Sequence, residues 1–217
     1  MIQISELHFT TEDGVKVLED VHLHVDRGEL VYLTGAAAVG KTLLLGLLAA
    51  QTPPQQGQIL VHGRNVARLS RDKALRLRRQ IGFVPQGFVP LSRTTVENLL
   101  FKLRALGDFR EQAEEKALLA LEIVGLLRQQ TADAAELSAV ERLRLGIAVA
   151  ICNDPLLLLI DTPFDGLGPE DQDQICALLG RISDRGTTVL AAARTPLPTG
   201  AQSRRVLELV DGRVVER

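Results

Sequence analysis

The octapeptide GAAAVGKT at positions 35–42 constrains this chain more than any other segment. It matches the pattern G-x-x-x-x-G-K-[ST], follows an apolar strand-like run at 29–34 and opens an apolar helix-like run at 43–50. In such a strand–loop–helix unit, backbone N–H groups and the positive end of the helix surround phosphate oxygens. The segment therefore predicts a nucleotide-binding α/β fold with a phosphate-binding loop.

The side chains of this loop suggest how phosphate and metal would be held. The Lys41 ammonium is expected to lie on the β- and γ-phosphates, and the Thr42 hydroxyl is expected to bind Mg²⁺. The middle of the loop lacks hydroxyls and has less backbone freedom than a glycine-rich loop, so weaker binding is expected. The predicted nucleotide-binding residues are Gly35, Ala36, Ala37, Ala38, Val39, Gly40, Lys41 and Thr42.

A second feature of a P-loop protein is an acidic residue after a buried strand. Asp161 ends the leucine-rich run at 155–161 and is the predicted Mg²⁺-linked carboxylate. The next residue, where a hydrolase of this type has glutamate, is Thr162, which cannot take a proton near neutral pH. General-base assistance typically contributes about 10²–10⁴-fold to a rate. The sequence thus predicts ATP and Mg²⁺ as ligands and leaves open what the protein does with them.

Composition narrows the class of partner. A chain of 217 residues is long enough for one compact α/β domain, and its net charge of −2 does not favour nucleic acid. Aromatic residues make up 3% of the chain, so few bases could be stacked. Cys152 and Cys176 are isolated in apolar stretches and are expected to be buried thiols. No nucleic-acid partner is therefore expected.

Targeting features also point away from a protein that spans a membrane by itself. The first nine residues alternate like a strand rather than a signal peptide, and no apolar run approaches the ~20 residues of a membrane span. A cytoplasmic location is expected unless a membrane partner recruits the chain. The basic segment 71–80 is interpreted as an exposed helical face, with contact to lipid or a partner as the alternative. His22 and His24 are interpreted as a solvated strand face rather than a metal site.

The order of the periodic segments predicts one domain with two lobes. An alternating hairpin, with a turn at 12–14, comes before the loop, and a long helical stretch interrupts the later strands. We expect 1–87 and 151–217 to form the RecA-like and β core, and 88–150 to form a helical subdomain. Strands are predicted at 2–9, 17–25, 29–34, 81–86, 155–161, 187–193 and 205–215.

Taken together, these landmarks resemble the ATP-binding cassette (ABC) family. The segments that carry the resemblance to the subgroup of the cell-division ATPase FtsE and the lipoprotein-release ATPase LolD are LRRQIGFVPQ (77–86), RTTVENLLF (93–101) and 107–127. The resemblance covers essentially the whole chain. It implies a two-lobed ABC ATPase domain, with a P-loop NTPase (RecA-like) core, an N-terminal antiparallel β-hairpin and an inserted helical subdomain.

The resemblance also implies roles for residues outside the loop. Gln86 matches the glutamine that touches Mg²⁺ and the attacking water, and Asp161 matches the Walker B aspartate, so the implied Mg²⁺ ligands are Thr42, Gln86 and Asp161. The implied signature segment is Leu137, Ser138, Ala139, Val140 and Glu141. In the family, two copies sandwich two ATP molecules, each between one copy's phosphate loop and the other's signature.

The same resemblance implies partners and a location. The segment after Gln86 would face the coupling helix of an integral membrane permease-like subunit of the FtsX type. The chain is then expected to form a homodimer or heterodimer. Through its partner, it is expected to be a peripheral protein on the inner face of the cell membrane.

The chain departs from the family pattern at positions that matter for hydrolysis. Thr162 replaces the catalytic glutamate and Arg194 the switch histidine, and arginine has no acceptor with which to relay a proton. Ala139 and Val140 replace signature glycines that let backbone N–H groups approach a phosphate. Thr11 stands where an aromatic residue normally stacks on adenine.

Three further side chains in these segments have open roles. Phe9 lies near Thr11 but is expected to point into the buried side of the hairpin. Asp165 and Glu170 are candidates for a displaced base, with surface carboxylates as the favoured interpretation.

Three hypotheses for the function follow. The leading one is a nucleotide-binding subunit of an FtsE/LolD-like complex whose hydrolysis is impaired and whose output is association with a membrane partner. The second is an active ABC ATPase that drives extrusion or cell-division signalling, with Gln86, a displaced carboxylate or the phosphate itself assisting the water. The third is a soluble P-loop regulatory or DNA-associated protein, which the acidic balance and low aromatic content disfavour.

Overall fold

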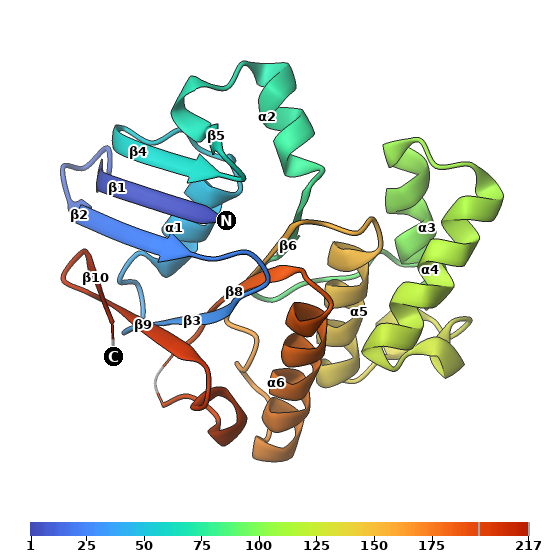
Figure 1. Ribbon diagram of the computed structural model, residues 1–217. Helices are drawn as coiled ribbons and strands as arrows, with labels where there is room; N and C mark the ends of the chain where they lie inside the picture. The colour runs from blue at the N-terminus through green and yellow to red at the C-terminus, as the bar shows by residue number, and fades with distance from the viewer. Residues whose placement is uncertain (195, 217) are drawn as a thin grey trace.

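Two β-sheets, one of four strands and one of six, form the framework of the chain (Figure 1). The computed structural model describes residues 1–194 and 196–216. The strands are β1 (Ile2–Thr10), β2 (Lys16–Val25), β3 (Leu30–Thr34), β4 (Gln56–Val61), β5 (Arg64–Asn65), β6 (Ile81–Val84), β7 (Leu157–Asp161), β8 (Thr188–Ala192), β9 (Arg205–Val210) and β10 (Arg213–Glu216). The α-helices are α1 (Lys41–Leu48), α2 (Arg71–Arg78), α3 (Thr95–Leu106), α4 (Arg110–Val124), α5 (Ala139–Ile151) and α6 (Pro169–Asp184). Short 3₁₀ turns lie at Val66–Arg68, Leu127–Gln129, Ala134–Glu136 and Thr199–Ala201.

The smaller sheet contains the predicted N-terminal hairpin. Its strand order is β2-β1-β4-β5, and all its pairings are antiparallel. The pairing of β1 with β2 shifts register between Ile4 and Leu7, where Glu6 has a left-handed backbone (φ 51°). A bulge of this kind adds one residue to a strand and reverses which face the following side chains occupy. The buried positions therefore change from Ile2 and Ile4 to Leu7.

The larger sheet is the parallel core that the strand–helix alternation predicted. Its order is β10-β9-β3-β8-β7-β6, and only the β9–β10 pair is antiparallel. The predicted strand at 205–215 is divided by a turn at Asp211 and Gly212, both with positive φ, which makes it a hairpin.

Strand β3 shows how the apolar runs are used. Tyr32 packs into one hydrophobic cluster of the core and Val31 and Leu33 into the other, because successive side chains point to opposite faces. A sheet buried on both faces needs such continuous apolar strands. The core sheet therefore lies between two apolar layers.

The helices complete these two layers. Leucines of α1 pack in the same cluster as the small sheet, whereas residues of α5 and α6 pack against the other face of the core sheet. Helices α3, α4 and α5 contact one another at one side of the molecule (Figure 1). The sequence predicted a long helical stretch at 88–150, and these three helices occupy most of that range. Helix α6 had no specific prediction; it begins with Pro169, which suits the first helical position.

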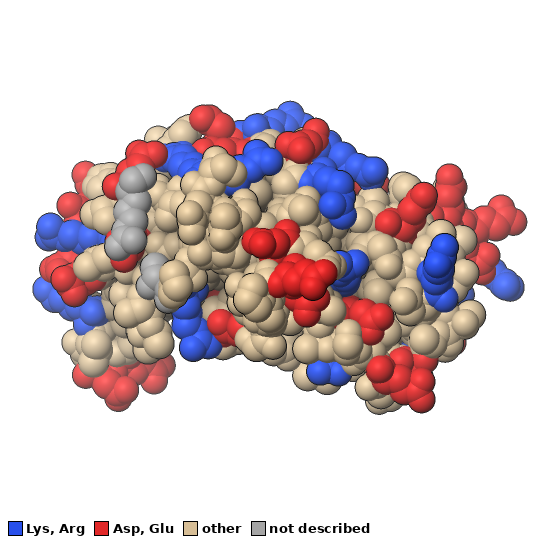
Figure 2. Space-filling model, turned by 90° about the horizontal axis from the view of Figure 1, so that it is seen from below, with Lys and Arg blue, Asp and Glu red and all other residues tan. Residues whose placement is uncertain are grey.

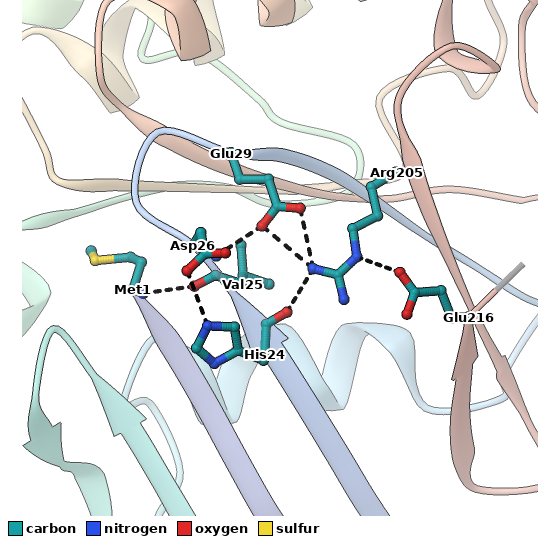
Figure 3. Close-up of polar contacts among 7 residues, drawn as sticks. All are labelled: Met1, His24, Val25, Asp26, Glu29, Arg205 and Glu216. Atoms are coloured by element: carbon teal, nitrogen blue, oxygen red, sulfur yellow. Dashed lines mark hydrogen bonds and ion pairs between the residues drawn. The ribbon is translucent and has the colours of Figure 1, made fainter.

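A polar cluster around Arg205 ties the two sheets together (Figure 3). The Arg205 guanidinium donates to the backbone oxygen of His24 at 2.9 Å, to Glu29 Oε1 at 3.1 Å and to Glu216 Oε1 at 2.8 Å. These partners come from the end of β2, the residue before β3 and the end of β10. One side chain at the start of β9 thereby fixes the small sheet and the C-terminal hairpin to the core.

The surface shows no dominant charge on the face seen from below. In Figure 2, acidic and basic side chains lie among one another and among uncharged residues. His22 and His24 are exposed and contact Asp20 and Asp26, each at 3.0 Å, and the described residues contain no group of metal-binding side chains. Within residues 1–194 and 196–216, no helix has the length and apolarity needed to cross a bilayer.

Replacing the Arg205 hub is expected to destabilise the fold. Arg205→Met keeps much of the aliphatic stem but removes hydrogen bonds to three segments, some of them to charged groups. At such a half-exposed site, their loss should lower the free energy of unfolding by about 1–2 kcal/mol. For a chain of this size the melting temperature should fall by about 2–8 °C. Thermal unfolding followed by circular dichroism measures the shift. Arg213→Met, on the exposed side of β10, is the matched control and should leave the melting temperature nearly unchanged; equal shifts would contradict the role given to Arg205.

Candidate nucleotide-binding site

The carboxyl ends of the parallel strands open into one cavity of about 490 Å³. Such edges are where ligands bind in open α/β sheets. The walls come from the N-terminal hairpin, the loop before α1 and the segments after β6, β7 and β8. The lining residues are Phe9, Thr11, Val17, Ala37, Ala38, Gly40, Lys41, Thr42, Leu43, Gln86, Asp161, Thr162 and Arg194.

The two glycines of the loop are required by its backbone. Gly35 has a φ of 148° and Gly40 a φ of 108°, both in the range that favours glycine. A Cβ atom at Gly35 would lie 2.5 Å from the backbone oxygen of Leu209, and one at Gly40 would lie 2.7 Å from Val17 Cγ1. The loop thus passes too close to β9 and to the hairpin for any larger residue.

The alanine-rich middle of the loop adopts a backbone conformation that is energetically unfavourable for alanine. Ala38 has a φ of 59°, the left-handed conformation that costs an alanine about 1–2 kcal/mol. This strain agrees with the expectation that the loop has less freedom than one with glycine at this position.

Lys41 bends back over the loop that precedes it. Its ammonium donates hydrogen bonds to the backbone oxygens of Gly35 at 2.8 Å and Ala36 at 2.6 Å. Burial lowers the pKa of this ammonium; Asp161 opposes that shift, Arg194 adds to it, and Asp165 opposes it. An ammonium already partly desolvated and directed at carbonyl oxygens is suited to exchange them for phosphate oxygens.

The structure brings two of the three predicted metal ligands together. Thr42 Oγ1 donates to Asp161 Oδ2 at 2.6 Å. The other carboxylate oxygen, Oδ1, is buried and has no hydrogen-bond partner within the described residues. A buried carboxylate oxygen without a donor is costly unless a cation or solvent reaches it. The hydroxyl and the carboxylate therefore fit a Mg²⁺ ion, which prefers oxygen ligands.

Thr162 lies directly beside this pair in an unusual conformation. Its φ is 50°, which is an outlier for a β-branched residue. Its backbone N–H donates to the Ala192 oxygen at 2.8 Å, while its hydroxyl is buried without a partner in the described chain. The backbone is thus held where the family has its glutamate, and the side chain offers no carboxylate to a water molecule.

Gln86 and Arg194 also line the cavity, but a carboxylate outside its wall holds both. The Gln86 amide donates to Asp165 Oδ2 at 3.3 Å, and Arg194 Nη2 forms an ion pair with the same oxygen. The sequence predicted Gln86 beside the metal; here it bonds to Asp165. Glu170, the other acidic candidate, lies in the first turn of α6 and does not line the cavity.

Phe9 contacts both the hydrophobic core and the cavity. As expected, it packs against the hydrophobic cluster on the buried side of the hairpin, and it also lines the cavity together with Thr11 and Val17. The bulge at Glu6 shifts the alternation of β1, so that Phe9 lies on the same face of the strand as the buried Leu7. An aromatic side chain is therefore present although Thr11 occupies the usual position.

The predicted signature segment, 137–141, lies at the start of α5 and does not contribute to this cavity. Ser138 caps the helix: its hydroxyl accepts from the Glu141 N–H at 3.3 Å, and the Glu141 carboxylate accepts from the Ser138 N–H at 2.9 Å. The Ser138 hydroxyl also donates to the Glu141 carboxylate at 2.8 Å, and the hydrogen bonds from the Ser138 N–H and hydroxyl lower the pKa of Glu141. The two residues kept from the family pattern thus have a local structural role as a capping box.

These observations define the class as a P-loop nucleotide-binding protein, and comparisons with known proteins give the family. A model of the ABC transporter family matches residues 18–165. The chain is 30% identical over 216 residues to the cell division ATP-binding protein FtsE of Bacillus subtilis (strain 168), with 99% of this chain and 95% of that protein covered. It is 37% identical over 199 residues to FtsE of Mycobacterium tuberculosis, covering 91% and 86%.

A solved structure agrees with this result. The dimeric ATP-binding cassette MJ0796, described as a post-hydrolysis state bound to ADP and Pi, superimposes with a TM-score of 0.86 at 26% identity. The match covers 100% of this chain and 98% of that one. The chain belongs to the ABC transporter family, as an ATP-binding domain with FtsE among its relatives.

Phe9 is expected to support the base of a bound nucleotide. Stacking of a base on an aromatic ring is worth about 1–3 kcal/mol, so Phe9→Leu should weaken ATP and ADP alike by roughly 5-fold to 100-fold. Isothermal titration calorimetry measures both affinities. Phe109→Leu removes an aromatic ring that is 79% exposed in another part of the chain and should change neither affinity. An unchanged affinity in Phe9→Leu would place the base elsewhere.

Proposed function

We propose that this chain is the nucleotide-binding subunit of an FtsE-type ABC complex that binds ATP with Mg²⁺ and hydrolyses it poorly. The observation that carries the proposal is that one cavity contains the groups that would bind phosphate and metal but lacks the base that would activate water. The loop, Lys41, Thr42 and Asp161 are arranged for phosphate and metal, whereas Thr162 presents no base beside them.

The absence of a carboxylate at 162 is the main reason to expect slow hydrolysis. A water molecule that attacks phosphorus must lose a proton, and a side-chain base contributes about 10²–10⁴-fold to such a step. Arg194 compounds the loss, because a guanidinium is always charged and has no acceptor. It is also engaged with Asp165, which keeps that carboxylate from acting as a free base.

The proposed metal site uses Thr42 and Asp161 from this chain. Bound Mg²⁺ would supply charge neutralisation for the phosphates. Thr42 and Asp161 already lie within hydrogen-bond distance of each other, so they need little rearrangement to share one ion. Gln86 is proposed as a third ligand only after it leaves Asp165.

The proposed partner is an integral membrane subunit of the FtsX type. The segment after Gln86 exposes two apolar side chains that are two positions apart: Val89 is 81% exposed and Leu91 is 42% exposed. Single apolar residues are normal on a surface, but an exposed apolar cluster such as this pair favours a binding site. Through this partner, the chain is proposed to lie on the inner face of the cell membrane.

The proposed assembly is a pair of such domains, as in the dimeric cassette to which the chain is similar. The chain would then combine two damaged elements, because base and signature are both altered in one copy. We also propose the division into a core (1–87 and 151–217) and a helical subdomain (88–150), which the mutual packing of α3, α4 and α5 supports.

Restoring the carboxylate tests the impaired step. Thr162→Glu is expected to raise steady-state ATP turnover by roughly 10²-fold, because it returns a proton acceptor to the cavity. Thr162→Gln introduces a side chain of nearly the same size as glutamate but without a carboxylate, so it should not raise ATP turnover. A Thr162→Glu rate no higher than that of Thr162→Gln would contradict the proposal that a missing base limits the native protein.

The docking surface has its own test. Val89→Asp places a charge in the exposed apolar cluster and should abolish co-purification with a co-expressed FtsX-type protein in detergent. Val15→Asp alters a valine that is 60% exposed in the turn of the N-terminal hairpin and is the matched control. Retention of the membrane protein by Val89→Asp, or its loss in both variants, would argue against this surface.

A further inference from the structure

Three side chains from three separate segments meet at the carboxyl edge of the core sheet. Gln86 follows β6, Asp165 follows β7, and Arg194 follows β8, and these strands are neighbours in the order β8-β7-β6. Asp165 Oδ2 accepts from the Gln86 amide at 3.3 Å and forms an ion pair with Arg194. One carboxylate oxygen thus holds two groups whose equivalents in the family serve the nucleotide.

This cluster borders the phosphate end of the cavity. Gln86 and Arg194 line the cavity beside Lys41 and Thr42. Asp165 lines an adjoining hollow of about 290 Å³ that shares Gln86, Asp161 and Thr162 with the cavity.

The charges of the cluster also reach the phosphate-binding lysine. Arg194 and Asp165 act on the pKa of Lys41 in opposite directions. Asp165 therefore sits close enough for its charge to matter to a phosphate held by Lys41.

We propose that the Asp165 carboxylate stands in for the γ-phosphate, holding Arg194 and Gln86 when no triphosphate is bound, and so sets the preference of the site between ATP and ADP. The inference rests on the proposed binding of nucleotide in this cavity. It goes further by naming the residue that determines specificity for the terminal phosphate.

The physical reason is competition between two anions for the same donors. A γ-phosphate entering beside Lys41 carries negative charge, needs donors and meets the negative charge of Asp165. The Arg194 guanidinium then has to divide its donors between the carboxylate and the phosphate. ADP ends at the β-phosphate and does not require Arg194 or Gln86. The ion pair therefore disfavours ATP relative to ADP.

The charges at positions 165 and 194 also compensate each other. Asp165 without Arg194 would leave an uncompensated carboxylate next to the phosphate site, and Arg194 without Asp165 would add a cation close to Lys41. The opposite charges of the Asp165 carboxylate and the Arg194 guanidinium cancel. We therefore treat these two side chains as one functional pair, whose effect is separate from the loss of the base at position 162.

The experiment compares a triphosphate with a diphosphate on the full chain. Affinities for Mg²⁺ with adenosine 5′-(β,γ-imido)triphosphate, which is not hydrolysed, and for Mg²⁺ with ADP are measured by calorimetry. Asp165→Asn keeps the size of the side chain and removes its charge. It should strengthen triphosphate binding by roughly tenfold and change ADP binding by less than about twofold.

Two further variants make the result specific. Arg194→Ala leaves Asp165 uncompensated and should weaken the triphosphate more than ADP, and Asp165→Asn in the same chain should reverse that selective loss. Asp184→Asn is the matched control: its carboxylate lies 4.0 Å from Arg204 and lines neither hollow, so it should alter neither affinity.

The outcomes separate this inference from the proposed function. Weaker triphosphate binding in Asp165→Asn, or equal changes for both nucleotides, would overturn the role given to Asp165 while leaving nucleotide binding intact. If the unaltered protein binds neither nucleotide and Lys41→Ala makes no difference, the proposed function itself fails, and this inference fails with it.

Discussion

The central constraint on this molecule is a parallel sheet buried on both faces. Side chains of continuous apolar strands such as β3 and β7 pack into the hydrophobic layers on both faces of the sheet. Polar residues that bind a ligand can therefore lie only at the ends of these strands. The carboxyl ends of β3, β6, β7 and β8 therefore meet at one edge. Lys41 and Thr42, Gln86, Asp161 and Arg194 are far apart in the chain and reach one cavity for this reason.

Much of this could be predicted from the sequence because the signals are local. The loop pattern, the leucine run that ends in Asp161 and the capping residues Ser138 and Glu141 each lie within a few positions, and the structure places the loop and Asp161 together as expected. Strand and helix order followed from periodicity, and the family comparison and structural similarity confirm the fold.

The features that were missed depend on register or on long-range contact. The bulge at Glu6 decides which later residues of β1 are buried, and nothing in the alternation of β1 marks where a bulge will form. The contribution of Phe9 to the cavity wall was therefore not predicted. The ion pair between Asp165 and Arg194 joins residues 29 positions apart through the packing of β7 on β8. Asp165 is exposed, in agreement with its interpretation as a surface carboxylate; only its partner, which follows β8, could not be predicted from the local sequence.

The departures from the ABC pattern are of two physical kinds. Thr162 removes a base from a strained but intact backbone, whereas Asp165 and Arg194 form a compensated pair beside the phosphate position. In the proposed function, the first kind slows a chemical step; in the further inference, the second changes which nucleotide is held. Together these proposals describe a domain that binds phosphate and metal and whose output depends on the bound nucleotide rather than on turnover.

Nucleotide binding and steady-state ATP turnover, measured on one purified sample with and without the membrane partner, test this account most directly. The account predicts saturable binding of ATP with Mg²⁺ that Lys41→Ala abolishes, together with turnover indistinguishable from that of Lys41→Ala. Turnover of about 1 s⁻¹ or more, in the range of ordinary enzymes and abolished by Lys41→Ala, would contradict it.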